Sequence, residues 1–180
     1  MTEGWDLNTF FSLPASAASI SIDNAASDGL IVVDISDPQG VDDISAQEER
    51  TDGILTVQVD GQRTTINAPL IDDETTAQWQ AHIAADVPST LDVENGAGKI
   101  NAEMRDATLS ELTLHLGVGS MSVALPAGEY SADLSCDVGK ILLTLPEDAA
   151  VRISADSGLG NTTASSNYQL IDGYYVSAAF

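Results

Sequence analysis

The chain has few basic residues and a single cysteine, and both shortages exclude functions. Six lysines and arginines stand against 28 aspartates and glutamates, so the net charge is −22. A surface of this sign repels phosphate groups, which excludes nucleic acid as a partner and disfavours adsorption onto an anionic bilayer. The acidity fits a salt-adapted cell and, equally well, a generally acidic proteome or a cation-rich cell surface. Cys136 cannot form an internal disulfide, and its place in an apolar stretch predicts a buried structural thiol.

Long apolar runs and catalytic motifs are also missing. Nothing approaches the roughly 18 consecutive apolar residues of a membrane span, and the first residues lack the features of a secretory signal. We therefore expect no direct membrane insertion by this chain and a cytoplasmic location, unless the chain is the soluble part of a longer envelope protein. No Gly-x-Ser-x-Gly elbow, Walker loop, complete dinucleotide fingerprint or zinc-spaced Cys/His cluster is present. These gaps predict no enzyme, no catalytic residues and no cofactor.

The second half of the chain does contain a repeat with a nearly fixed period. Gly98, Gly119, Gly139 and Gly160 are separated by 21, 20 and 21 residues, and such a period is typical of stacked structural repeats. Apolar and polar residues alternate on both sides of each glycine, as in Leu112–Leu116, which indicates strands with one buried face. Glycine suits a corner between two such strands because it accepts positive φ and leaves room for close backbone approach.

Aligning the repeats on these glycines predicts which side chains stack. Equivalent strands about 4.8 Å apart would turn each inward column into an apolar ladder. We therefore predict an all-β fold, specifically a β-solenoid or β-helix-like stack of glycine-cornered repeats of about 20 residues, with an antiparallel sandwich as the alternative. Leu114 and Leu143 are expected in the core, and His115 is expected to face solvent. The inward columns are Leu91, Leu112, Ala132 and Ile153; Val93, Leu114, Leu134 and Ala155; Asn95, Leu116, Cys136 and Ser157; Ile100, Met121, Ile141 and Thr162; Ala102, Val123, Leu143 and Ala164; and Met104, Leu125, Leu145 and Ser166.

The repeats also predict how the chain is organised. Residues 1–17 are expected to be an N-terminal arm or cap, and residues 18–180 a single repetitive β domain whose regular repeats span 91–166. Residues 36–50 are expected to be a polar insertion with a short helical turn at its end. The fourth repeat has small or polar inward residues, which is typical of the terminal repeat of a stack. The tail, 168–176, is expected to cap that end with aromatic area.

Carboxylates near the corners are weak candidates for a metal site. Stacking would bring some of them to a shared edge, where Ca²⁺ would find part of the six to eight oxygen ligands that it takes. However, the sequence has neither an EF-hand loop nor the nonapeptide calcium repeat. A solvated acidic face is the favoured interpretation, so no metal is predicted. The weak candidates are Asp92, Glu94, Asp133, Asp137 and Asp156.

Four segments carry a family resemblance: Arg50–Val59, Glu94–Ile100, Gly117–Gly128 and Cys136–Asn161. They resemble the bacterial toastrack-type putative adhesins, a family related to the C-terminal domain of LiaF-like cell-wall stress proteins. The resemblance implies a repetitive β domain, often tethered at the envelope, with no established enzymatic role. In LiaF-like members it implies a domain behind membrane helices that helps to restrain a stress-sensing kinase system. This chain departs from that pattern because it contains no membrane segment.

The predicted function is a non-catalytic β-repeat scaffold or interaction domain, adhesin-like and linked to the bacterial cell envelope or its stress signalling. A protein partner or self-association is the expected kind of interaction, since open strand edges template association. The alternative is a module that binds a divalent cation or a glycan through acidic edge residues. An enzyme on a repetitive β scaffold would need clustered carboxylates in a groove, and the abundance of acids alone is weak support for that.

Overall fold

The described part of the chain consists of strands and turns, with no helix. A computed structural model describes residues 6–23, 31–36, 43–51, 54–62, 77–156 and 160–180. The coarser prediction, an all-β fold, is confirmed for these residues. The chain divides into two compact units, Met1–Thr144 and Leu145–Phe180. Among the described residues, no helix has the length and apolar composition that crossing a bilayer requires.

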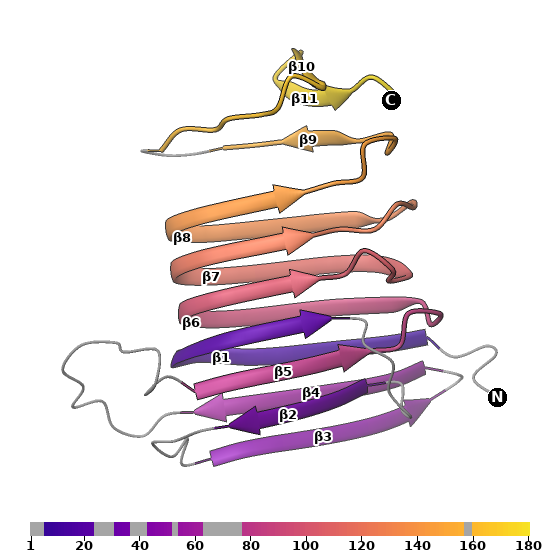
Figure 1. Cartoon of the computed structure of the whole chain (residues 1–180). Coiled ribbons are helices and arrows are strands. Elements are labelled where there is room, and N and C mark those ends of the chain that lie inside the picture. Colours follow the sequence, from indigo (N-terminus) through magenta and orange to yellow (C-terminus); the bar gives the residue numbers. More distant parts are fainter. Residues whose placement is uncertain (1–5, 24–30, 37–42, 52–53, 63–76, 157–159) are drawn as a thin grey trace. The chain divides into compact units, whose positions relative to one another are not determined.

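The first unit is one mixed sheet of eight strands (Figure 1). Its main path runs β2-β5-β1-β6-β7-β8, while β4 pairs with β1 and β3 pairs with β4. β1 is parallel to β4, β5 and β6, and the pairs β6–β7 and β7–β8 are also parallel. The pairs β2–β5 and β3–β4 are antiparallel. The strands are β1 (Asp6–Asp23), β2 (Ile31–Ser36), β3 (Asp43–Thr51), β4 (Ile54–Gln62), β5 (Ala77–Ile83), β6 (Ser89–Glu103), β7 (Leu109–Ala124) and β8 (Ser131–Thr144).

Three long strands, β6, β7 and β8, pair in parallel with their glycines aligned. Gly98 pairs with Gly119, and Gly119 pairs with Gly139. The hydrogen bonds at the strand ends recur from one strand to the next: the Met104 amide donates to the Ala124 carbonyl at 2.9 Å, and the Leu125 amide donates to the Thr144 carbonyl at 3.0 Å. The paired positions coincide with the columns predicted for β6 to β8, because the alternation of apolar residues and the glycine period together specify one register.

Each of these strands folds over at its glycine, as Figure 1 shows. The aligned glycines have φ of 120°, 146° and 154°, which side chains with a Cβ rarely adopt. A Cβ on Gly119 would also lie 1.9 Å from the Gly98 carbonyl oxygen. Both observations confirm the predicted reason for glycine at the corner. We call the parts before the bend the first limbs (89–96, 109–117 and 131–137) and the parts after it the second limbs (99–103, 120–124 and 140–144).

Both limbs of β7 contribute to the core. Leu112, Leu114 and Leu116 of the first limb have no exposed surface, and Met121 and Val123 of the second limb are 2% and 1% exposed. The inward residues change from even to odd numbers across the glycine. Without the bend, this change would turn one limb's apolar side chains to water. The corner therefore lets both limbs enclose one aliphatic interior.

The same columns are less covered on β8. Ala132 is exposed, and Leu134, Cys136 and Leu143 are half-buried. β8 is the last strand of the sheet path, so β7 is its one partner within this sheet. The prediction that Leu143 is a core residue equal to Leu114 is therefore wrong, and so is the prediction of a fully buried Cys136 thiol.

The return turn after β7 begins at Leu125 and Pro126. Proline cannot donate to a ladder, so it suits the end of pairing. The Tyr130 hydroxyl closes this turn by donating a hydrogen bond to the Pro126 carbonyl at 2.8 Å. Burial raises the pKa of the Tyr130 hydroxyl above its ordinary value, because the charged form loses water there.

β1 differs from the arm or cap expected for residues 1–17. Residues 1–5 lie outside the described residues, but from Asp6 onward the chain is an inner strand of the sheet. β1 is parallel to β6 on one side and to β4 and β5 on the other. The side chains of Leu7, Thr9, Ile20 and Ile22, which the structure describes, are at most 1% exposed. Pairing on both edges satisfies the backbone of this apolar segment, which an end position would leave half unpaired.

The bend of β1 uses different residues from the bends of β6 to β8. Ala18 takes the position opposite Gly98. Between its two paired stretches β1 holds two more residues than β6, because Leu13 pairs with Asn95 and Ala17 pairs with Ala97. This longer corner needs no glycine, and it accommodates a proline within residues 13–17 where the ladder is interrupted.

β3 lies where the polar insertion with a helical turn was expected, 36–50. Residues 43–51 form a strand antiparallel to β4, and residues 37–42 lie outside the described residues. Pairing with β4 outweighs the helix propensity of Ala46–Glu49, as tertiary context commonly does. The prediction of a helical turn in this segment is therefore wrong.

The second unit is a small antiparallel sheet in the order β10-β11-β9, with strands β9 (Arg152–Ser154), β10 (Tyr168–Ile171) and β11 (Tyr174–Ser177). Asp172 and Gly173 turn the β10–β11 hairpin with φ of 50° and 85°, the positive values of a tight hairpin turn. The guanidinium of Arg152 lies 3.7 Å from the ring centroid of Tyr174, which adds a cation–π contact.

The expected fourth repeat does not continue the parallel columns. Ile153 was expected above Ala132, but it lies in β9 and pairs antiparallel with Tyr175. Ser157 lies outside the described residues. The fourth repeat offers small or polar side chains, such as Ala155 and Thr162, where a ladder needs apolar volume. The segment around Ile153 forms β9 instead and pairs with β11.

Candidate interaction surfaces

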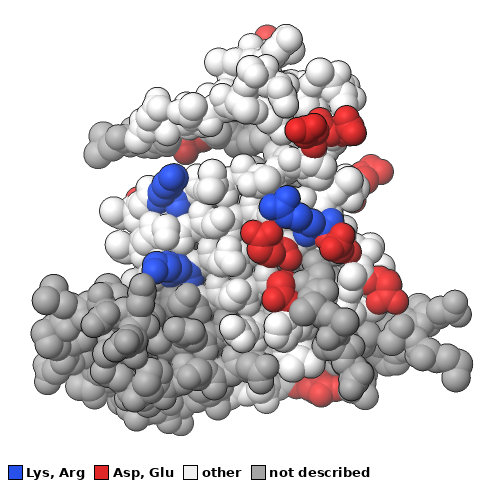
Figure 2. All heavy atoms as spheres, viewed as in Figure 1, with Lys and Arg blue, Asp and Glu red and all other residues white. Residues whose placement is uncertain are grey.

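The outward faces of the two sets of limbs differ in charge. The first limbs present five carboxylates, and the second limbs present both lysines of the chain together with serine, asparagine and threonine. In Figure 2, which has the view of Figure 1, some basic side chains stand apart at the left, where the strands fold over, and others lie among acidic side chains to the right of centre. Most of the acidic side chains visible on this face lie toward the right. The five carboxylates of the first limbs are Asp92, Glu94, Glu111, Asp133 and Asp137.

The predicted metal candidates are not gathered into one site. Thr113 pairs with both Asp92 and Asp133 and therefore separates them, so the two carboxylates are about 10 Å apart by strand spacing. Asp156 belongs to the second unit. Among the described residues, no group of three or more His, Cys, Asp or Glu side chains is arranged to hold a metal ion. The stacking thus spaces these carboxylates along a face.

His115 faces outward as predicted, but it is not simply solvated. Its Nδ1 lies 2.9 Å from the Ser135 hydroxyl of β8, and its Nε2 lies 3.9 Å from a carboxylate oxygen of Asp137. The imidazole therefore links β7 to β8 on the acidic face. The other histidine, His82, lies on β5 and contacts the Asp23 carboxylate of β1 at 2.5 Å.

The lysine face contains a shallow hollow of about 310 Å³. Ser120 pairs with Lys99 on one side and with Lys140 on the other, so the three side chains form one outward column. None of the lining residues is acidic. Sequence reasoning missed this column, although Gly-Lys-Ile occurs at both 98–100 and 139–141 and gave the signal. The lining residues are Lys99, Ile100, Asn101, Ser120, Met121, Ser122, Lys140 and Leu142.

Exposed valines line the corner edge beside the lysines. Val118 and Val138 are 53% and 63% exposed and pair with one another. Each immediately precedes a corner glycine, where the chain turns outward. The bend therefore displays an apolar pair next to the two lysines.

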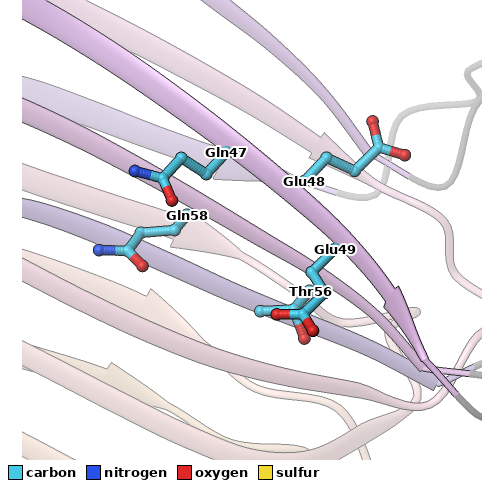
Figure 3. A pocket seen from close by; sticks show the side chains of 5 residues that line it. All are labelled: Gln47, Glu48, Glu49, Thr56 and Gln58. Carbon is cyan, nitrogen blue, oxygen red and sulfur yellow. The ribbon is translucent and has the colours of Figure 1, made fainter.

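A second hollow, of about 330 Å³, lies on the β3–β4 pair (Figure 3). Gln47 lies beside Gln58 and Glu49 beside Thr56, while Glu48 points away from these four side chains. The Gln58 amide donates a hydrogen bond to the Asp60 carboxylate at 3.0 Å. This hollow is polar and exposed, with amides and carboxylates as its functional groups.

These features define a β-rich domain with two polar faces, and comparison with known proteins assigns its family. The family model for the N-terminal domain of toast_rack, DUF2154, matches residues 10–145. The chain therefore belongs to this family, which confirms the toastrack resemblance of the four segments named above. The match ends within one residue of the boundary between the two units.

The fold is also similar to that of a solved structure. The crystal structure of a putative cell adhesion protein from Clostridium sporogenes ATCC 15579 matches with a TM-score of 0.82 and 18% sequence identity. The match covers 99% of this chain and 82% of the other. At this identity the likeness shows the fold. A search of curated proteins gave no significant match.

Proposed function

We propose that this chain is a non-catalytic, adhesin-like interaction domain that acts at the bacterial cell envelope. In this proposal the coils β6, β7 and β8 form a short β-solenoid, and its outward limb faces contact the partner. Membership of the toast-rack family supports the proposal, as does the similar fold of a protein described as a putative cell adhesion protein. Binding through a broad face also fits a repetitive scaffold, which typically offers extended contact surfaces.

The observation that carries the proposal is the register of the long strands. Three successive strands present their outward side chains in straight columns, one strand spacing apart. Such an array can meet a partner that itself repeats, because one contact recurs at a fixed interval along the stack. Repeated weak contacts then add up to a firm attachment.

The form of the hollows gives further support. Both are open hollows on strand faces: polar side chains of β3 and β4 line one, and polar and apolar side chains of β6, β7 and β8 together line the other. Small-molecule sites are usually concave and mostly apolar, and they bury most of their ligand. Open, shallow surfaces of this kind enclose little of a small ligand, so they fit attachment to a large partner better than turnover of a small substrate.

The proposal is tested by attaching the full chain to beads and measuring their retention on envelope fractions of the source bacterium. We expect retention well above that of beads carrying an unrelated folded protein of similar net charge. Beads carrying the heat-unfolded chain provide the second control. Retention no greater than that of the acidic control protein, on every envelope fraction, would contradict the proposal.

A further inference from the structure

We propose that Lys99, Ser120 and Lys140 bind a hydroxylated polymer that carries carboxylate or phosphate groups about 10 Å apart. The polymer would lie along the stacking direction, across the second limbs of β6, β7 and β8. This inference rests on the proposed function, because it names the kind of partner that such an interaction domain would hold.

The placement of the lysines is the first support. The chain has only two lysines among its 180 residues, and the register puts both in one outward column with Ser120 between them. Both side chains are exposed and line the same hollow. Two strand spacings separate them, which sets a distance of about 10 Å between the anionic groups of a matching ligand.

Local charge favours an anionic ligand despite the strongly negative chain. At physiological salt, charges more than about 8 Å apart in solvent are largely screened, and the charged residues among those that line the hollow are both lysines. The one acidic residue on the second limbs is Glu103, and its carboxylate accepts a hydrogen bond from Arg105 at 3.3 Å. A densely charged polyanion would still meet the acidic first limbs, so sparse anionic groups fit best.

The remaining lining residues favour a hydroxylated chain over a peptide. Asn101, Ser120 and Ser122 offer amide and hydroxyl groups that both donate and accept hydrogen bonds. Leu142, which is 52% exposed, offers an apolar contact to the C–H groups of such a chain. On β7 the backbone is paired on both edges, so a peptide cannot add there as a further strand.

The test uses the full chain and calorimetric titration with three defined probes. An oligogalacturonate carries carboxylates, an oligo(glycerol phosphate) carries phosphates, and a neutral malto-oligosaccharide of similar length carries neither. We expect binding of at least one anionic probe at low salt, weakening as salt is added, and no binding of the neutral probe at the same concentration. The two anionic probes distinguish carboxylate from phosphate as the group recognised.

A matched pair of double variants tests the lysines themselves. Lys99→Gln with Lys140→Gln is expected to weaken anionic binding at least tenfold. Arg50→Gln with Arg152→Gln removes the same charge from outside the second limbs and is expected to change affinity less than twofold. Replacing both lysines by arginine retains the charge and should retain binding. Circular dichroism and melting curves of each variant confirm that it is folded.

Three results would overturn the inference. These are absence of binding by both anionic probes, equal weakening in the two double variants, and lysine-dependent self-association in sedimentation experiments without any probe. The last result would assign the column to a second copy of the chain. If wild-type beads and Lys99→Gln/Lys140→Gln beads adhere equally to envelope fractions, the proposed function stands and this inference fails. If probe binding is lysine-dependent but no bead adheres, the inference stands and the proposed function fails.

Discussion

β7 and β8 carry nearly the same pattern of residues, yet their inward side chains differ in burial. Leu114 of β7 has no exposed surface, whereas Leu134, its partner in the same column, is half-buried. β7 pairs with β6 and β8, but β8 pairs within the sheet with β7 alone. Burial therefore depends on the neighbours of a repeat as much as on its own residues. This dependence is expected of stacked repeats, where each unit is stabilised mainly through its interfaces with adjacent units.

The comparison extends to the corners, where β7 and β8 behave alike. Gly119 and Gly139 both have positive φ. A Cβ on either would lie under 2 Å from the carbonyl oxygen of the corner glycine in the preceding long strand, Gly98 or Gly119. The burial of the inward side chains differs between the two strands, but the backbone conformation at the corner is the same. The corner thus constrains each of these strands in the same way, whereas the burial of the inward side chains depends on the position of the strand in the sheet.

The largest expected effect comes from Gly119→Ala. The new Cβ would meet the Gly98 oxygen at 1.9 Å, and alanine disfavours the observed φ of 146°. Both penalties act on backbone, so we expect unfolding free energy to fall by about 4 kcal/mol or more. Urea unfolding followed by circular dichroism measures this loss.

Gly128→Ala is the matched control for the corner. Gly128 has a similar φ of 151°, but its nearest neighbours are side-chain atoms of Tyr130 at 3.7 Å or more. The conformational penalty is present without the backbone clash, so we expect a loss of about 1–2 kcal/mol. Equal losses for the two variants would show that close stacking at the corner contributes nothing.

The next prediction compares a core truncation in β7, which is paired on both edges, with one in β8, the last strand of the sheet path. Leu114→Ala removes a fully buried side chain, so we expect it to lower unfolding free energy by about 2–5 kcal/mol. Leu143→Ala removes a half-buried leucine of β8, and we expect about half that loss. The comparison requires both variants to be measured in the same urea series. A loss for Leu143→Ala as large as that for Leu114→Ala would mean that β8 is covered in solution.

The sequence predicted the inward columns of β6 to β8 because two signals agreed there. Period-two alternation identified the buried face, and the glycine interval aligned the strands. Where one signal is absent, the prediction fails. β1 has Ala18 opposite Gly98, so a search for corner glycines does not find its bend. Its partner β6 also lies about 80 residues along the chain, and no local pattern reports a contact over that separation.

The candidate site was predicted less well than the fold. Of the carboxylates named as weak metal candidates, Asp92 and Asp133 are separated by Thr113 in the register. The lysine column was overlooked because the search for ligand groups considered acidic residues, which are abundant, and not the two lysines, which are rare. The same register that explains the core would have aligned Lys99 with Lys140.

The smallest expected effect concerns the link between β7 and β8 on the acidic face. His115→Ala removes the contact with the Ser135 hydroxyl at 2.9 Å, in a partly exposed position. Because water replaces the lost partner there, we expect unfolding free energy to fall by about 0.5 kcal/mol, or at most about 1 kcal/mol. Ser135→Ala removes the same bond from the β8 side, so the double variant should lose little more than either single variant. Strictly additive losses in this cycle would mean that the bond contributes nothing to holding β8 on β7. In that case, backbone pairing and the half-covered apolar column would account for the attachment of the last strand.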